Sequence, residues 1–160
     1  GVGGRAVDDD GAGAEAGEHV GDDGLHLRRA GGADVDDGGG CREVCEATEF
    51  VTLVTQGDDG PHVVGNWGDY LRKLGIQEDT ILLLAGHYVQ TERNLRGNSR
   101  VQLLVASRKV QGTRGPGQGY LITGTAEILE SGDVVAAVKA QFPWARGALV
   151  IHVEEVTAQL

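Results

Sequence analysis

The sequence predicts a mainly β fold, a small closed or split β-barrel of antiparallel strands with short helices set aside from it. Six runs of β-branched and apolar residues recur between residue 50 and the C-terminus. Gly- and Asp-rich turns or longer loops link these runs, which favours antiparallel neighbours. Only two or three short segments have the character of helices, so strands dominate the expected fold.

Composition divides the chain near residue 40. Residues 1–40 hold 13 of the 27 glycines and ten acidic residues against three arginines, so they carry −7 of the formal net charge of −10. They contain no Phe, Trp, Tyr, Ile or Met, and such a segment cannot bury enough apolar surface to offset its ordering entropy. We expect residues 1–40 to form a disordered acidic tail and residues 41–160 to form one folded domain.

Composition also argues against several classes of protein. No segment approaches the roughly 20 apolar residues of a membrane span, and the N-terminus lacks the apolar core of a signal peptide, so we expect a soluble cytoplasmic protein. The acidic balance argues against nucleic acid as a partner. Cys41 and Cys45 are spaced i, i+4, but no CxxC pattern or histidine partner completes a metal site, and we expect none.

The first half of the domain has the pattern of a hairpin. Residues 42–48 allow one or two helical turns. The apolar run 50–55 and the shorter run 62–64 flank a Gly-Asp-Asp-Gly-Pro turn, which predicts two paired strands. Trp67 and Tyr70 follow where the second strand meets a loop. Large rings at such a place plug the end of a core or form flat walls for a planar ligand, and both alternatives stay open.

The middle of the domain continues with strands. Residues 71–75 form a short basic connection, and residues 80–84 form the next strand. Two further strands, over 101–106 and 120–129, enclose a Gly-rich loop that we expect to be a long hairpin turn.

One helix and one strand complete the chain. Ser131 is expected to cap a helix over 134–141, and Pro143 ends that helix because it cannot continue the backbone hydrogen bonds. The last strand spans 147–156.

The segment from Ala85 to Lys109 has the arrangement of an anion site. It begins in a turn at Gly86, crosses a polar helical turn near Thr91 and ends in a strand that closes with Arg108 and a lysine. A helix start offers unpaired backbone N–H groups and a partial positive charge, and a hydroxyl adds a donor. The two basic residues, if their strand ends nearby, supply full charges for a phosphate. An ordinary surface loop with a capped helix is the alternative.

Several blocks, in this order, resemble the small FMN-binding proteins of the FMN-binding split-barrel superfamily, to which pyridoxamine 5'-phosphate oxidase also belongs. The blocks are VTQGDDGPHVVGNWGDYL, TERNLRGNSRV, SRKVQGTRGPGQGYLITGTAEI and FPWARGALVIHVEEVTAQL. The similarity runs from about residue 43 to residue 160, which is essentially the whole folded unit.

The resemblance implies a six-stranded Greek-key split barrel that forms a homodimer and holds FMN non-covalently at the subunit interface. By position, Trp67 and Tyr70 match aromatic residues that line the flavin ring, and Trp144 matches one that approaches it from the FPWAR turn. Leu160 matches a C-terminal leucine that reaches the flavin of the partner subunit. Thr91 matches a phosphate-contacting threonine in a Lys-Thr pair.

This sequence departs from the family pattern at two places. Gln90 stands where the family has lysine, and the loss of that charge weakens phosphate binding unless another cation takes over, because one charged hydrogen bond is worth about 1.5–3 kcal/mol. The Asn-Thr pair before the tryptophan is replaced by Gly65 and Asn66, of which Asn66 still offers a polar contact. The full set expected around the cofactor is Asn66, Trp67, Tyr70, Gly86, Gln90, Thr91, Arg108, Lys109, Trp144 and Leu160.

Three functions are compatible with this pattern. The first is an FMN-binding electron-transfer protein that exchanges electrons with a redox partner protein or NAD(P)H. The second is an oxidoreductase of the pyridoxamine phosphate oxidase or flavin reductase type, against which stands the lack of a further basic cluster for a phosphorylated substrate. The third is a binding or sensor module that has lost tight FMN binding, for which Gln90 is the hint. No side chain is placed as a catalytic acid or base, and His87 is expected to be a solvated loop residue.

Overall fold

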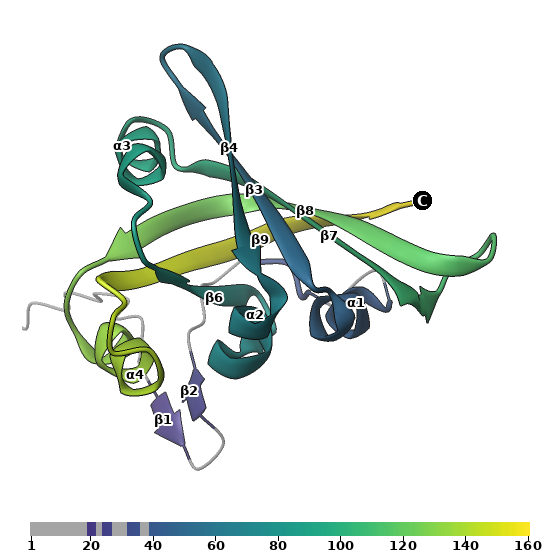
Figure 1. Cartoon of the computed structure of the whole chain (residues 1–160), viewed down its shortest axis with the longest axis horizontal. Helices are drawn as coiled ribbons and strands as arrows, with labels where there is room; N and C mark the ends of the chain where they lie inside the picture. Colours follow the sequence, from purple (N-terminus) through teal and green to yellow (C-terminus); the bar gives the residue numbers. More distant parts are fainter. Residues whose placement is uncertain (1–18, 22–23, 27–31, 36–38) are drawn as a thin grey trace, which may run out of the picture.

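A computed structural model describes residues 19–21, 24–26, 32–35 and 39–160 (Figure 1). Seven strands form one antiparallel sheet in the order β4-β3-β7-β8-β9-β6-β5, and four helices lie against it. The strands of this sheet are β3 (Phe50–Gly57), β4 (Gly60–Trp67), β5 (Ile76–Gln77), β6 (Thr80–Ala85), β7 (Arg100–Gln111), β8 (Pro116–Leu129) and β9 (Gly147–Gln159). The helices are α1 (Cys41–Ala47), α2 (Gly68–Leu74), α3 (Val89–Gly97) and α4 (Asp133–Gln141).

The predicted mainly β class is confirmed, and all six predicted strands are present with longer bounds. The seventh strand, β5, has only two residues and was not predicted. The number of helices is four rather than two or three, because residues 71–74 of the predicted connection form the end of α2, and Gly75 follows as its C-cap. Ser131 does not cap α4, since the N-cap position is Gly132, which has a positive φ of 101° and no side-chain cap hydrogen bond.

Two apolar clusters pack on the two faces of the sheet. The larger lies inside the barrel and includes Leu53, Leu103 and Ile122, which are fully buried or nearly so. The smaller joins α4 to the outer face of β6 and β9. Strand β6 is buried on both faces for this reason, which explains its unbroken apolar run.

A bulge bends the longest pair of strands. The register of β8 on β9 shifts between Thr123 and Gly124, where Thr123 pairs with Glu155 and Gly124 pairs with Val153. A Cβ at Gly124 would lie 2.0 Å from the carbonyl oxygen of His152, so only glycine fits this close approach.

Part of the acidic segment before residue 41 packs on the barrel. Val35 is fully buried in the main core, its backbone N–H donates to the carbonyl of Glu78, and the N–H of Ala33 donates to that of Val153 at 2.9 Å. Strands β1 (His19–Gly21) and β2 (Gly24–His26) form a separate two-stranded hairpin. The rest of the predicted tail lies outside the described residues. No helix in the described part of the chain is long and apolar enough to cross a membrane.

Candidate functional site

An open pocket lined mostly by aromatic side chains lies where β4, α2 and the loop after β6 meet. Its volume is about 480 Å³, within the range of small-molecule sites. Its walls are Phe50, Gly65, Asn66, Trp67, Tyr70, Leu84, Gly86, His87, Tyr88 and Trp144. The structure therefore brings together five of the ten residues that the sequence analysis placed around a cofactor.

The first wall is formed where β4 ends and α2 begins. The chain turns here because Gly68 lies against the backbone of Thr48, whose carbonyl oxygen would be 1.9 Å from a Cβ. The side-chain oxygen of Asn66 accepts a hydrogen bond from the N–H of Trp67 at 2.9 Å. The Trp67 ring then points outward, 56% exposed, with Phe50 edge-on at 5.8 Å between ring centroids. An indole held in this way is a ready surface for a flat ligand.

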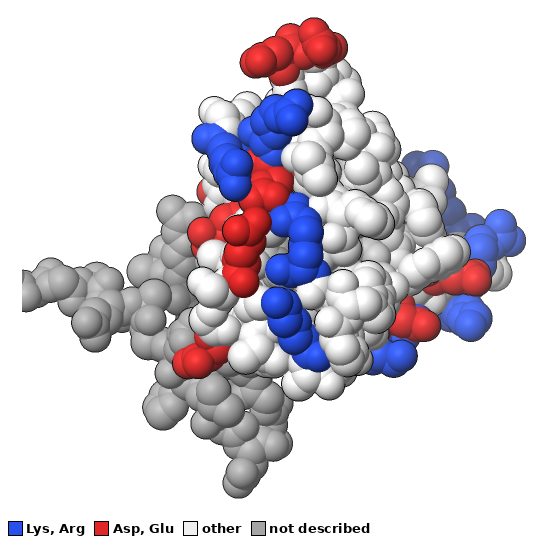
Figure 2. Space-filling view, turned by 60° about the vertical axis from the view of Figure 1, so that its left-hand side comes forward, with Lys and Arg blue, Asp and Glu red and all other residues white. Residues whose placement is uncertain are grey.

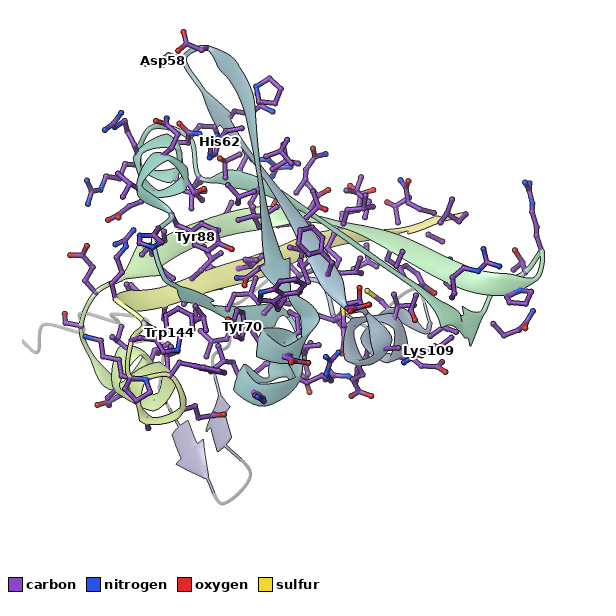
Figure 3. The ribbon with its side chains drawn as sticks, in the orientation of Figure 1. Asp58, His62, Tyr70, Tyr88, Lys109 and Trp144 are labelled. Atoms are coloured by element: carbon purple, nitrogen blue, oxygen red, sulfur yellow. The ribbon has the colours of Figure 1, made fainter. Side chains whose placement is uncertain are left out.

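The opposite wall is a cluster of three rings. Tyr70 lies 5.1 Å from Phe142 and 6.2 Å from Trp144 between ring centroids. Trp144 is nevertheless 60% exposed, which leaves much of its indole free for a ligand. Gly86 allows this placement, since a Cβ there would be 3.2 Å from the Trp144 ring. Figure 3 shows Tyr70, Tyr88 and Trp144 on the same side of the molecule.

Tyr88 contributes a polar group that the sequence analysis missed. It occupies the N-cap position of α3 with a left-handed φ of 51°, which is uncommon for a residue other than glycine. Its hydroxyl donates a long hydrogen bond of 3.4 Å to the carbonyl of Gly65 across the pocket. Burial raises the pKa of Tyr88 from 10 to about 12, so the phenol keeps its proton, and can act as a donor, further into the alkaline range than an ordinary tyrosine. An aromatic residue just before the polar helix was the only available sequence signal.

The start of α3 forms the polar end of the site. Thr91 is fully buried, and its Oγ1 has no hydrogen-bond partner among the described residues. Gln90 donates from Nε2 to the side-chain oxygen of Asn94 at 2.8 Å, and Asn94 donates to Oγ1 of Thr55 at 3.1 Å. A buried hydroxyl without a partner beside free helix N–H groups is the arrangement in which an anion completes the hydrogen bonding.

Arg146 ties the aromatic wall to this helix. Its Nε donates to the carbonyl of His87 at 2.6 Å, and its backbone N–H donates to the carbonyl of Ala85 at 2.9 Å. Its guanidinium also forms ion pairs with Glu92 at 2.6 Å and with Glu130 at 3.3 Å. The turn that carries Trp144 is thereby fixed to the loop between β6 and α3. Sequence analysis gave Arg146 no role.

Three predicted site residues lie elsewhere in the chain. Thr55 contacts α3 through Asn94, and it pairs with Val101 on β7. Lys109 lies eight residues beyond Val101 on that strand, which corresponds to about 25 Å at the usual strand rise. Figure 3 shows Lys109 at the far side from Tyr88, so the expected meeting of Arg108 and Lys109 with the helix start does not occur within one chain.

Leu160 also lies away from the pocket. It follows β9, which ends beside β8 where Gln159 pairs with Gly119, and its side chain is 85% exposed (Figure 1). No described residues form a group of three or more His, Cys, Asp or Glu side chains that would hold a metal.

These features define a small split β-barrel protein with an aromatic pocket that leads toward a helix start. The chain belongs to the pyridoxamine 5'-phosphate oxidase family, whose sequence profile matches residues 40–159. It is 42% identical over 111 residues to the FMN-binding protein of Nitratidesulfovibrio vulgaris (strain DSM 19637 / Miyazaki F), an alignment that covers 69% of this chain and 88% of that protein.

Solved structures share the fold at lower identity. HupZ from Group A Streptococcus has a TM-score of 0.58 and 20% identity, covering 73% of this chain and 91% of its own. A FAD-binding protein from Mesorhizobium loti has a TM-score of 0.52 and 19% identity over 74% of this chain and 90% of its own. An FMN-binding protein from Syntrophomonas wolfei subsp. wolfei has a TM-score of 0.51 and 15% identity, with 74% and 83% covered.

Proposed function

We propose that this chain binds FMN non-covalently and transfers electrons between a donor and an acceptor. The observation that carries the proposal is the aromatic pocket, which lies next to a helix start where the buried Thr91 hydroxyl lacks a partner among the described residues. FMN has this same division, with a flat aromatic ring at one end and a phosphate at the other. The 42% identity to an FMN-binding protein supports the same ligand.

The residues present fit the two ends of that ligand. Trp67, Tyr70 and Trp144 would hold the ring by aromatic contact and exclude water from it. Thr91 and the first N–H groups of α3 would receive the phosphate. Bound FMN supplies the redox chemistry, and the protein supplies binding and electrostatic surroundings. Asn66 and Tyr88 offer polar groups at the pocket, and His87, which we expected to be a solvated loop residue, is also one of its walls.

The proposal includes a homodimer, because the chain presents an apolar face that one subunit leaves open. On the outer side of the sheet, Val54 pairs with Val63, and Leu104 pairs with Leu121 on the next strand. Val63 is 60% exposed and Leu104 is 42% exposed. The two apolar pairs lie in different rows of this face, since Val54 pairs with Gln102 on β7 and Leu104 pairs with Thr52 on β3. Exposed apolar side chains on one face of a sheet support an interface there. In such a dimer the extended end of β9 would carry Leu160 to the partner's pocket.

The test is the visible absorption spectrum of the purified, dialysed protein before and after addition of FMN. Flavin bands that stay with the protein through gel filtration, at one FMN per chain and at twice the mass of one chain, support the proposal. A protein that takes up no FMN at tens of micromolar contradicts it. Leu104→Lys is expected to yield monomers with weaker FMN binding, because a charge replaces an apolar contact at the proposed interface.

An enzyme of the pyridoxamine phosphate oxidase type is the second candidate, since the family profile carries that description. Two assays separate it from electron transfer between partners. Oxidation of pyridoxamine 5'-phosphate by the FMN-loaded protein would favour the oxidase, and rapid bleaching of the flavin bands by NAD(P)H would favour a reductase. Slow reaction with both would favour a redox partner protein as the electron donor.

A further inference from the structure

The aromatic pocket is lined without permanent charge. None of its ten wall residues is Asp, Glu, Lys or Arg. On the face that Figure 2 brings forward, the charged side chains follow one column, and a broad surface beside that column carries no charge. Neutral polar side chains must therefore fix how a flat ligand is oriented in the pocket.

Tyr88 is held at both of its ends. Its carbonyl oxygen accepts the N–H of Glu92 at 2.8 Å, which fixes the residue at the start of α3. Its hydroxyl lies at the end of β4, where it contacts Gly65 and Asn66. The side chain thus joins two elements that border the pocket.

The hydroxyl oxygen of Tyr88 is occupied, whereas its proton has no close acceptor among the described residues. The side-chain oxygen of Asn66 accepts from Trp67, so the amide nitrogen of Asn66 is left to donate to the phenol. This bond lowers the pKa of Tyr88 against the larger effect of burial. The phenol itself donates to the Gly65 carbonyl at 3.4 Å, beyond the usual range of about 2.5–3.0 Å for an O–H···O bond. An acceptor on a ligand at a shorter distance would replace the carbonyl.

The backbone of Tyr88 also marks this position. Its φ is 51°, and among the described residues other than glycine only Leu160 shares a positive φ. Such conformations persist where the surroundings hold them, and they cluster at ligand sites. Partial burial takes the hydroxyl away from water, and a hydrogen bond formed in such a place is stronger than one in solvent.

We propose, on the basis of the proposed function, that Tyr88 orients the flavin ring by donating a hydrogen bond from its hydroxyl to the carbonyl-bearing edge of the ring, in place of the Gly65 carbonyl. One edge of a flavin ring is apolar and the other carries two carbonyl oxygens, so a single donor distinguishes the two orientations. Reduction of a flavin adds negative charge to the carbonyl-bearing edge. A donor at that edge binds the reduced form more tightly than the oxidised form, so Tyr88 is expected to raise the reduction potential of bound FMN.

The experiment measures flavin binding by Tyr88→Phe, which keeps the aromatic ring and removes the donor. The Kd is expected to rise about threefold for oxidised FMN and for oxidised riboflavin alike, because the donor acts on the ring and not on the phosphate. The Kd for reduced FMN is expected to rise about thirtyfold, because the lost bond is to a charged acceptor. This tenfold difference between oxidation states corresponds to a potential lower by about 30 mV for a two-electron couple. Fluorescence titration gives the Kd values, and anaerobic equilibration with reference dyes gives the potential.

Tyr120→Phe is the matched control. The hydroxyl of Tyr120 also donates to a backbone carbonyl, that of Gly39, but the side chain is buried in the main core and is not a wall of the pocket. This variant is expected to lower Tm and to leave the Kd values and the potential unchanged.

Three outcomes would overturn the inference. A loss of affinity for FMN but not for riboflavin in Tyr88→Phe would place the hydroxyl at the phosphate. An unchanged potential would mean that the hydroxyl does not face the carbonyl-bearing edge, and an equal change in Tyr120→Phe would make the effect one of stability. A wild type that binds neither flavin would contradict the proposed function and this inference with it, so the two failures are distinguishable.

Discussion

Thr91→Val is the substitution for which the structure predicts two effects of opposite sign. Valine has nearly the same shape as threonine and replaces the hydroxyl with a methyl group. The Oγ1 of Thr91 is buried without a hydrogen-bond partner among the described residues. Burial of such a group costs about 1–3 kcal/mol. Removal of the hydroxyl is therefore expected to stabilise the FMN-free protein by about 1 kcal/mol, or roughly 3–5 °C in Tm for a domain of this size.

The same change is expected to weaken FMN binding. In the proposed complex the hydroxyl donates to the phosphate, and a hydrogen bond to a charged group contributes about 1.5–3 kcal/mol, which corresponds to roughly 10- to 100-fold in Kd. A residue that lowers the stability of the FMN-free protein but raises its affinity for FMN is expected to be retained for ligand binding. Differential scanning fluorimetry of the FMN-free protein and fluorescence titration with FMN measure the two effects.

Thr55→Val is the matched control. Thr55 is equally buried, but its Oγ1 accepts a hydrogen bond from Asn94 at 3.1 Å. Valine at position 55 leaves that amide without its acceptor, so this variant is expected to lose about 1–2 kcal/mol of stability. If Thr91→Val destabilises the FMN-free protein as much as Thr55→Val does, or if it leaves the Kd for FMN unchanged, the assignment of Thr91 to the phosphate is wrong.

Three further changes test other parts of the site. Trp144→Ala is expected to lower FMN affinity about tenfold with little effect on Tm, because the indole is 60% exposed; a large drop in Tm would make it a core residue instead. Arg146→Gln is expected to lower both Tm and FMN affinity, whereas Arg146→Lys keeps the charge but loses the forked contacts and is expected to lie between. Tyr88 keeps its proton in the folded state up to a pKa of about 12, while an unfolded tyrosine loses it near 10, so stability is expected to fall as pH rises from 10 to 12. Tyr88→Phe should remove that fall in denaturant melts, and an unchanged fall would refute the assignment.

The strands of the barrel could be predicted because the sequence patterns that specify them are local. The β3–β4 hairpin follows from alternating apolar residues around a Gly-Asp-Asp-Gly-Pro turn, and β6 follows from an unbroken apolar run. Helix α2 was missed because it begins at Gly68, a residue with poor helix propensity, and lasts only seven residues. Its start depends on the close approach of the Thr48 backbone, which is a tertiary contact.

The site was predicted less completely because it depends on which ends of strands meet. The aromatic residues Trp67, Tyr70 and Trp144 were found from the family pattern, and the fold brings them together. Arg108 and Lys109 lie far from the helix start of the same chain because β7 is twelve residues long and carries its last residues far from its first, so their place at a cofactor stays a prediction. Tyr88 was missed because its place in the pocket follows from a left-handed backbone conformation that no sequence pattern encodes.

The polar face of α3 explains why a glutamine, rather than a lysine, is found at position 90. A lysine at position 90 would stand three residues before Arg93 on the same helix face, where like charges repel. Glutamine instead accepts a hydrogen bond from Arg93 and donates one to Asn94. Gly57 belongs to the same unit, since a Cβ there would be 2.7 Å from the Asn94 side-chain oxygen. An arginine at 93 therefore favours a neutral residue at 90, so Gln90→Lys is expected to lower the stability of the FMN-free protein by about 0.2–0.5 kcal/mol in the wild type and by less in the Arg93→Gln background, as denaturant melts would measure.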